Sequence, residues 1–351
     1  MMYDILDTVD KWVSQGTPVA LATVVETWGS SPRQAGARMA ITNDMAMVGS
    51  VSGGCVETAV VQEAVDGLAD KKPRLLHYGV SDDTAWTVGL ACGGKMSVFV
   101  EPLDQGWWNY VSTAIRENHT LTTVTILEGE HVGKKIVCDF TIMNTYARPT
   151  LTTDQIRTLS DAALASLEHR KSQRITADGL SLMVDVHRRQ PRLIMIGGAH
   201  ISVALHQFAR QLGFRVILVD PRQVFATAER FPDIDKLMHV YPDKALTELG
   251  IDEETYIAVL THDPKIDDPA LITALPSDAP YIGVLSGKRS HEQRIERLHA
   301  AGVTDDLIAK IRTPIGINLN GKTPEEIALS VMAEIVAVRN GAAIVAQKQR
   351  A

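Results

Sequence analysis

Apolar residues recur along the first hundred positions in short runs and in helical repeats. Residues 18–27, 38–42 and 96–103 are strand-like apolar runs. Residues 56–69 place apolar side chains at helical spacing and contain no proline. The first residues form an amphipathic pattern, whose apolar side is made by Ile5, Leu6, Val9, Trp12 and Val13. These patterns predict a mixed α/β domain.

The next block, residues 104–190, alternates in the way that is typical of antiparallel strands. Residues 122–129, 134–140 and 180–187 are strand-like, and residues 153–170 have a helical pattern. Cys138 lies inside one of these runs and is predicted to be a core residue without a chemical role. We therefore expect a β-rich extension of the first domain here.

Near residue 190 a basic junction containing a proline leads into a different pattern. An apolar strand at residues 193–196 is followed by a glycine turn, a helix at 201–212 and a second strand at 215–220. This order predicts the opening of a doubly wound parallel sheet, as in the Rossmann fold. Two further strands are predicted at 256–263 and 281–286. We expect two domains, residues 1–190 and 191–351.

The last helix has a clear start signal. Thr323 is the expected N-cap, with Pro324 in the first turn and Glu326 at the third helical position, which together predict a capping box. Its apolar stripe, which we expect to pack across the face between the domains, consists of Ile327, Ala328, Val331, Ile335 and Val338.

Composition narrows the class of protein. The chain has 351 residues with 35 Lys and Arg against 42 Asp and Glu, a formal charge of −7, which argues against a nucleic-acid partner. Three cysteines are too few for a disulfide framework. The chain contains no apolar stretch of about 18 residues, and its start lacks a signal-peptide pattern. We expect a cytoplasmic protein that does not bind membranes.

A glycine-rich turn at residues 48–57 gives the sharpest chemical signal. Ser52, Gly53, Gly54 and Cys55 lead directly into the helix predicted at 56–69. Free backbone N–H groups and the helix dipole at such a place favour an anion such as phosphate. They also favour the thiolate form of Cys55, which is a nucleophile and a metal ligand. The alternative is a small buried cysteine at a tight turn.

A second cysteine stands in a similar setting, because Cys92 is followed by Gly93 and Gly94. Two Cys–Gly segments in one domain favour a functional pocket. Upstream of both, the loop at residues 27–39 carries Arg33 and Arg38, which could clamp an oxyanion, although a solvated loop is the alternative.

The Rossmann-like half carries a weaker nucleotide signature. Gly197 and Gly198 open the turn, but Ala199 and Ser202 replace the second and third glycines of the dinucleotide fingerprint. At the end of the next strand, Asp220 is placed to bind a ribose and Arg222 to accept a 2′-phosphate. NAD(P) or another nucleotide is one interpretation, and a packed βαβ unit with a degenerate site is the other.

Three more polar residues follow strands of this predicted sheet: His200, His262 and Asp263. Ligands of open α/β sheets bind outside the carboxyl ends of the strands, so these side chains could converge on one site. The alternative is local, with Asp263 capping a turn before Pro264 and His262 bonding nearby backbone.

At these residues the sequence resembles the XdhC/CoxI family, the maturation factors of molybdenum hydroxylases such as xanthine dehydrogenase and carbon monoxide dehydrogenase. The matching segments include GSSPRQAGARM, GSVSGGCVE and ACGGKMSVFVEPL in the first domain, and GGAHISVAL, LGFRVILVDPR and LTHDPKIDDPAL in the second. The resemblance implies a non-catalytic chaperone that binds the molybdenum cofactor, protects it during sulfuration and inserts it into the hydroxylase. Cys55 is then a candidate molybdenum ligand.

The implied partners are the target molybdenum hydroxylase and a cysteine desulfurase, and a homodimer is a candidate assembly. Two other functions stay open from the residues alone. One is an NAD(P)-dependent oxidoreductase in which His262 or His200 transfers a proton. The other is a transferase in which Cys55 carries persulfide sulfur.

Overall fold

A computed structural model of the chain describes residues 2, 4–29, 33–54, 56–79, 94–147, 150–169 and 171–343. The chain divides into two compact units, Met1–Arg189 and Gln190–Ala351. No helix in these described ranges is both long and apolar enough to cross a bilayer.

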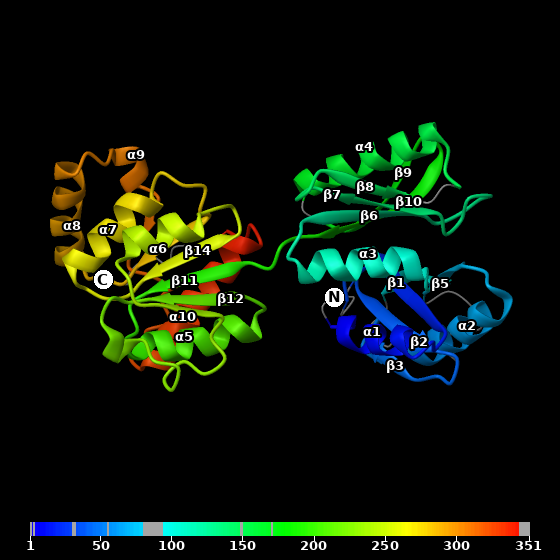
Figure 1. Cartoon of the computed structure of the whole chain (residues 1–351), viewed down its shortest axis with the longest axis horizontal. Helices are drawn as coiled ribbons and strands as arrows, with labels where there is room; N and C mark the ends of the chain where they lie inside the picture. Colours follow the sequence, from blue (N-terminus) through cyan, green and yellow to red (C-terminus); the bar gives the residue numbers. More distant parts are fainter. Residues whose placement is uncertain are drawn as a thin grey trace. The chain divides into compact units, whose positions relative to one another are not determined.

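The first part of the first unit is an antiparallel sheet of five strands in the order β3-β2-β1-β5-β4 (Figure 1). Its elements are α1 (Leu6–Ser14), β1 (Val19–Trp28), β2 (Arg38–Thr42), β3 (Met47–Gly49), α2 (Glu57–Asp70), β4 (Arg74–Tyr78), β5 (Lys95–Pro102) and α3 (Gln105–Arg116). Val60 and Ala64 of α2, and Val56 just before it, pack into the same apolar cluster as β1, β2 and β5.

A second antiparallel sheet of five strands follows, in the order β8-β7-β6-β10-β9. Its elements are β6 (Leu121–Ile126), β7 (Lys135–Asp139), β8 (Asn144–Ala147), α4 (Thr153–His169), β9 (Gln173–Ala177) and β10 (Leu180–His187). Helix α4 covers one face of this sheet. Helix α3 packs against both sheets, because Trp107 and Trp108 share one cluster with Leu21 of β1 and Val137 of β7 (Figure 1).

The second unit is built on one parallel sheet of six strands in the order β13-β12-β11-β14-β15-β16. Its elements are β11 (Arg192–Ile196), α5 (His200–Gln211), β12 (Arg215–Val219), the 3₁₀ turn η2 (Gln223–Phe225), β13 (Lys236–Met238), α6 (Pro242–Leu249), β14 (Thr255–Val259), α7 (Pro264–Ala274), β15 (Tyr281–Val284), α8 (Lys288–Ala300), α9 (Asp305–Ile308), β16 (Ile311–Arg312) and α10 (Pro324–Arg339). The chain order reverses at β11, which lies between β12 and β14. The predicted fold class, a mixed α/β domain followed by a Rossmann-like sheet, is confirmed.

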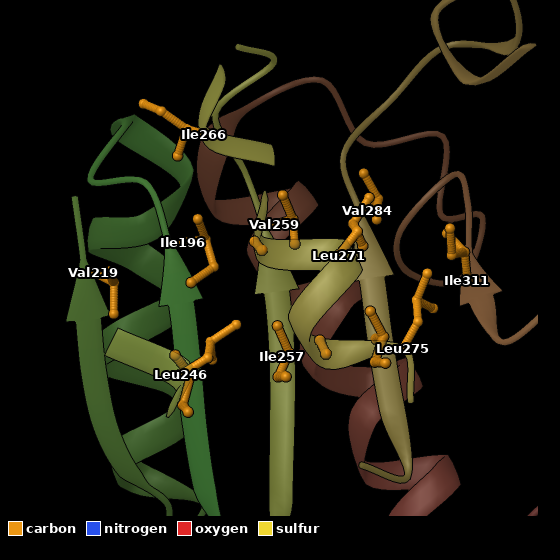
Figure 2. Close-up of a cluster of buried hydrophobic side chains, with 14 of the residues drawn as sticks. Ile196, Val219, Leu246, Ile257, Val259, Ile266, Leu271, Leu275, Val284 and Ile311 are labelled. Carbon is orange, nitrogen blue, oxygen red and sulfur yellow. The ribbon is translucent and has the colours of Figure 1, made fainter. Parts of the chain in front are cut away.

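Helices cover both faces of this parallel sheet. On one face, α6, α7 and α8 bury Leu246, Leu271 and Leu298 against the strands, and Figure 2 shows Ile196, Ile257 and other members of this cluster. On the other face α5 packs beside α10. Burial of β-branched and leucine side chains on both faces is what a parallel sheet requires.

The predicted capping box of α10 is confirmed, since the Thr323 side chain accepts a bond from the Glu326 N–H and Glu326 bonds back to Thr323. The expected use of its apolar stripe was wrong. Ala328, Val331 and Ile335 are fully buried against the sheet of their own unit. Both faces of a parallel sheet must be covered by other elements, and α10 covers one face together with α5.

Candidate functional site

The first glycine turn, residues 50–54, closes around a carboxylate of the chain itself. Glu57, the first residue of α2, accepts hydrogen bonds from the backbone N–H groups of Ser52 (2.9 Å), Gly53 (2.9 Å) and Gly54 (2.8 Å). It also accepts the hydroxyls of Ser50 (2.8 Å) and Ser52 (2.5 Å). Five donors therefore surround one side chain that is only 9% exposed.

This arrangement has a clear electrostatic signature. Burial by itself would raise the pKa of Glu57, but the hydrogen bonds from Ser52, Ser50 and Gly53 outweigh it and lower the pKa from 4.5 to about 2. The wrapping depends on glycine, because Gly53 and Gly54 have φ angles of +89° and +124°. The turn is thus held in a single shape by an ionised carboxylate.

Our expectation that these N–H groups would be free for an external anion was wrong. The three peptide groups that point into the turn already donate to Glu57. The sequence contains the signal for this, because a glutamate three residues after a helix-start turn can reach back to its backbone donors.

Cys55 itself lies outside the described residues, but the residues on either side of it are firmly held. The Gly54 N–H donates to Glu57, and the Val56 N–H donates to the hydroxyl of Ser52 (3.2 Å). Ser52 is 1% exposed, and Val56 is fully buried in the core beneath α2. The chain therefore enters and leaves position 55 through anchored backbone.

The second Cys–Gly segment is described only in part, because Cys92 and Gly93 lie outside the described residues. Gly94 precedes β5, whose first residue Lys95 pairs with Trp28 at the end of β1. The first glycine turn follows β3, whose last residue Gly49 pairs with Met39 near the start of β2. Because these strands alternate in direction, β3 ends and β5 begins toward the same end of the first sheet, β3 at the level of Ala22 and β5 at the level of Trp28 of β1.

The predicted anion clamp in the loop at residues 27–39 is wrong for Arg38. This side chain is 6% exposed, lies in β2 and pairs with Asp185 of the second sheet at 2.7 Å. Although Asp185 is buried, Arg38 and His187 lower its pKa. Arg38 therefore links the two sheets through Asp185 and is not part of an oxyanion clamp in the loop.

The second glycine turn, residues 197–199, is also closed on a carboxylate. The Gly198 N–H donates to Asp220 at 2.9 Å, and Asp220 is fully buried. Arg222 donates to the same carboxylate through its backbone N–H, its Nε and its Nη2, each at 2.9 Å. Burial raises the pKa of Asp220, but these bonds outweigh it and lower the pKa overall.

The 3₁₀ turn η2 packs against the second glycine turn. A Cβ placed on Gly198 would lie 2.3 Å from the carbonyl oxygen of Phe225 in η2, so η2 packs directly against this glycine. Arg222 stacks over the Phe225 ring, 4.4 Å from its centroid. Asp220 thus binds the turn and Arg222 with a buried carboxylate, and the predicted contacts of Asp220 with a ribose and of Arg222 with a 2′-phosphate stay predictions.

The remaining predicted residues differ in their surroundings. Asp263 caps α7 by accepting the Lys265 N–H at 3.0 Å, which confirms the structural alternative for this residue. His200 begins α5 and His262 follows β14, and both side chains are exposed. Asp263 still lies near the second turn, since its charge acts on Arg222. Asp220 and Arg222 follow β12 and Asp263 follows β14, and their convergence on one ligand stays a prediction.

Sequence reasoning did not single out Glu57, which closes the first turn, or Thr261, which packs against the second. A Cβ on Gly197 would lie 2.4 Å from Thr261 Cγ2. Within the described ranges, no group of three or more His, Cys, Asp or Glu side chains is arranged to hold a metal ion.

The fold and these turns define a class: an α/β protein with a Cys–Gly turn in its first unit and a Rossmann-type second unit. Residues 193–335 match the family model described as the XdhC Rossmann domain, and residues 12–79 match the model described as the XdhC and CoxI family. The chain belongs to the XdhC/CoxI family.

Relatives of known name cover most of the chain. A Bacillus subtilis protein named as a probable xanthine dehydrogenase subunit is 26% identical over 96% of this chain and 98% of its own length. "Molybdenum cofactor insertion chaperone PaoD" of Escherichia coli is 25% identical over 92% of this chain and 84% of its own length. "Uncharacterized protein YqeB" of E. coli is 27% identical over 95% of this chain, which spans only 46% of that longer protein.

A solved structure has the same fold. The crystal structure of a Bacillus halodurans protein, described as a xanthine dehydrogenase, superimposes with a TM-score of 0.77. The match covers 98% of both chains at 23% identity.

Proposed function

We propose that this chain is a chaperone for the molybdenum cofactor, which it holds as cargo at the end of the first sheet and delivers to a molybdenum hydroxylase. The names of the E. coli and B. subtilis relatives support this role. The observation that carries the proposal is the first glycine turn, where five donors to Glu57 fix the backbone on both sides of Cys55.

The proposed contact to molybdenum is the Cys55 thiolate, because thiolate is a soft ligand suited to such a metal. Ser52, Gly53 and Gly54 hold the backbone that carries it. Since the N–H groups of these residues donate to Glu57, they do not bind the cofactor's phosphate.

The second Cys–Gly segment, Cys92, Gly93 and Gly94, is proposed to form the other wall of the site, because β3 ends and β5 begins toward the same end of the sheet. Of the residues predicted in the second unit, His200 and His262 have exposed side chains. A cysteine desulfurase is the proposed sulfur donor while the cofactor is held.

Co-purification tests this function. The chain and a Cys55→Ser variant are expressed in a host that makes the cofactor, and bound molybdenum and pterin are measured by mass spectrometry and by fluorescence after oxidation. We expect both in the unchanged protein and a loss of about tenfold or more in Cys55→Ser, because a hydroxyl is a hard and weak ligand for this metal. Cofactor-free protein from such a host would contradict the proposal.

Cys138→Ser is the matched control. Cys138 is 5% exposed in β7 and contacts the hydroxyls of Ser160 and Thr145, both at 3.9 Å. We expect this variant to retain its cofactor. If Cys55→Ser also retained cofactor and still activated the hydroxylase, Cys55 would be a packing residue.

A further inference from the structure

A buried charge pair lies between α7 and α8, apart from the first glycine turn. Asp267 of α7 is 1% exposed and accepts the Thr261 hydroxyl at 2.5 Å on one oxygen. Its other oxygen accepts Nη2 of Arg294, from α8, at 3.2 Å. Burial raises the pKa of Asp267 even though Thr261 and Arg294 act in the opposite direction.

Arg294 is strongly under-satisfied for a buried guanidinium. It is 3% exposed, and its Nε and Nη1 find no hydrogen-bond partner among the residues that the structure describes. The same holds for Nδ1 of His291, which lies one helical turn earlier on the same face of α8. Arginine has five N–H donors and no acceptor, so the missing partner of Arg294 must be an acceptor.

A neighbouring arginine shows what a satisfied pair looks like in the same two helices. Arg297, one turn further along α8, donates Nε at 2.5 Å and Nη2 at 3.1 Å to Asp268 of α7. The side chain of Arg297 is 37% exposed, so water reaches the rest of it. The deeper arginine thus has fewer partners than the shallower one, which is the reverse of the usual rule for buried polar groups.

The pair also stands where parallel sheets bind ligands. Thr261 follows the carboxyl end of β14 and packs against Gly197 beside the point where the strand order reverses. Side chains of a helix lean toward its N-terminus, and α8 begins at this same edge after β15, at Lys288, with Gly287 as its N-cap. Arg294 is therefore directed toward the edge.

We infer that Arg294 and His291 bind an oxyanion, a phosphate group that is either free or part of a nucleotide, at the carboxyl edge beside β14. Phosphate oxygens supply the acceptors that the guanidinium lacks, and charge-assisted bonds of this kind are the strong ones. This site is separate from Asp220 and Arg222, which are already paired with each other, and from the cargo site of the first unit.

Calorimetry of the full chain tests the inference, with inorganic phosphate and adenosine monophosphate as the two probes in a phosphate-free buffer. We expect saturable binding of at least one probe and a loss of about tenfold or more in Arg294→Gln, the usual effect of removing a charged hydrogen bond. Equal affinities would mean that the site takes free phosphate, and tighter binding of the nucleotide that it takes the ester.

Arg297→Gln is the matched control and should bind as the unchanged protein does. Because Arg294→Gln leaves Asp267 buried without its partner, it could fail to fold, and His291→Ala then serves as the second variant. His291 is only half-buried, so its loss should weaken binding severalfold without disturbing the Arg294–Asp267 pair. Absence of binding for both probes, or unchanged binding by Arg294→Gln, would overturn the site and would mean that water satisfies Arg294.

Discussion

The two glycine turns follow similar sequence signals, yet they are closed in different ways. In the first, Glu57 lies three residues beyond Gly54 and takes up five donors of its own turn. In the second, Asp220 comes from the next strand, receives one peptide N–H, and is clamped by Arg222. The first is a local closure around position 55, whereas the second joins two strands of a sheet.

The two turns therefore differ in what surrounds them: the first is fixed by a carboxylate that follows it, and the second is packed against another segment of the chain. Glu57 fixes the backbone of Ser52, Gly53 and Gly54, the three residues before position 55. At the second turn η2 itself covers the glycine, since the Phe225 carbonyl stands against Gly198. A glycine turn before a helix therefore identifies an anion site only when its N–H groups have no carboxylate of the chain to bind.

The largest expected effect comes from removing Asp220. Asp220→Ala leaves the Gly198 N–H and the Arg222 guanidinium without their buried acceptor, so we expect the second unit to lose about 3 kcal/mol of stability. Hydrogen exchange of second-unit peptides measures it. All five tryptophans of the chain lie in the first unit, so the fluorescence transition in urea should stay in place.

Two outcomes would break the comparison for this turn. If second-unit peptides of Asp220→Ala exchanged no faster than those of the unchanged protein, the carboxylate would not be closing the turn. If the unchanged protein bound NAD and lost that binding on this substitution, Asp220 would be a ribose ligand after all.

The first turn should fail in acid. Since its folded-state pKa is lowered from 4.5 to about 2, Glu57 contributes stability that is present above pH 4.5 and is lost as the pH falls toward 2. A shift of that size corresponds to about 3 kcal/mol at most. Tryptophan fluorescence in urea at a series of pH values should show the decline.

Glu57→Gln should remove that part of the decline and lower stability at pH 7 by about 2 kcal/mol, because a neutral amide offers the five donors one oxygen only. Glu63→Gln is the matched control in the same helix, since Glu63 is paired on the surface with Arg74. An identical acid slope in Glu57→Gln and the unchanged protein would show that the ionised carboxylate does not hold the turn.

The spacing of apolar residues along the chain predicted most of the fold, because burial of one or both faces of an element requires that spacing. The apolar runs at residues 193–196 and 215–220 became β11 and β12, since a sheet covered on both faces needs continuous apolar strands. Short or polar strands such as β13 and β16, of three and two residues, carry no such signal. The surface against which α10 buries its apolar stripe was also not predicted, because the pattern of apolar residues on a helix does not identify the element that it packs against.

The site was less predictable, because partners distant in the sequence decide which polar groups are free. The sequence placed a glycine turn before α2 and Asp220 at the end of β12, but it did not show that Glu57 and Arg222 are their partners. That Arg38 is taken by Asp185, 147 positions away along the printed sequence, follows from the packing of two sheets and from no local motif.

The smallest effect tests the comparison through one serine that bonds to each turn, Ser52 within the first and Ser202 in the first part of α5. Ser52 donates its hydroxyl to the ionised Glu57 and accepts the Val56 N–H, whereas Ser202 donates to the neutral carbonyl of Gly197 at 2.5 Å. Both serines are buried, so exposure does not distinguish them.

Because hydrogen bonds to a charged acceptor are the stronger, Ser52→Ala should lower stability by about 2 kcal/mol and Ser202→Ala by about 1 kcal/mol. Tryptophan fluorescence in urea reports the first value and hydrogen exchange in α5 the second. Equal costs would mean that the two turns are held with the same strength, and a larger cost at Ser202 would reverse the comparison.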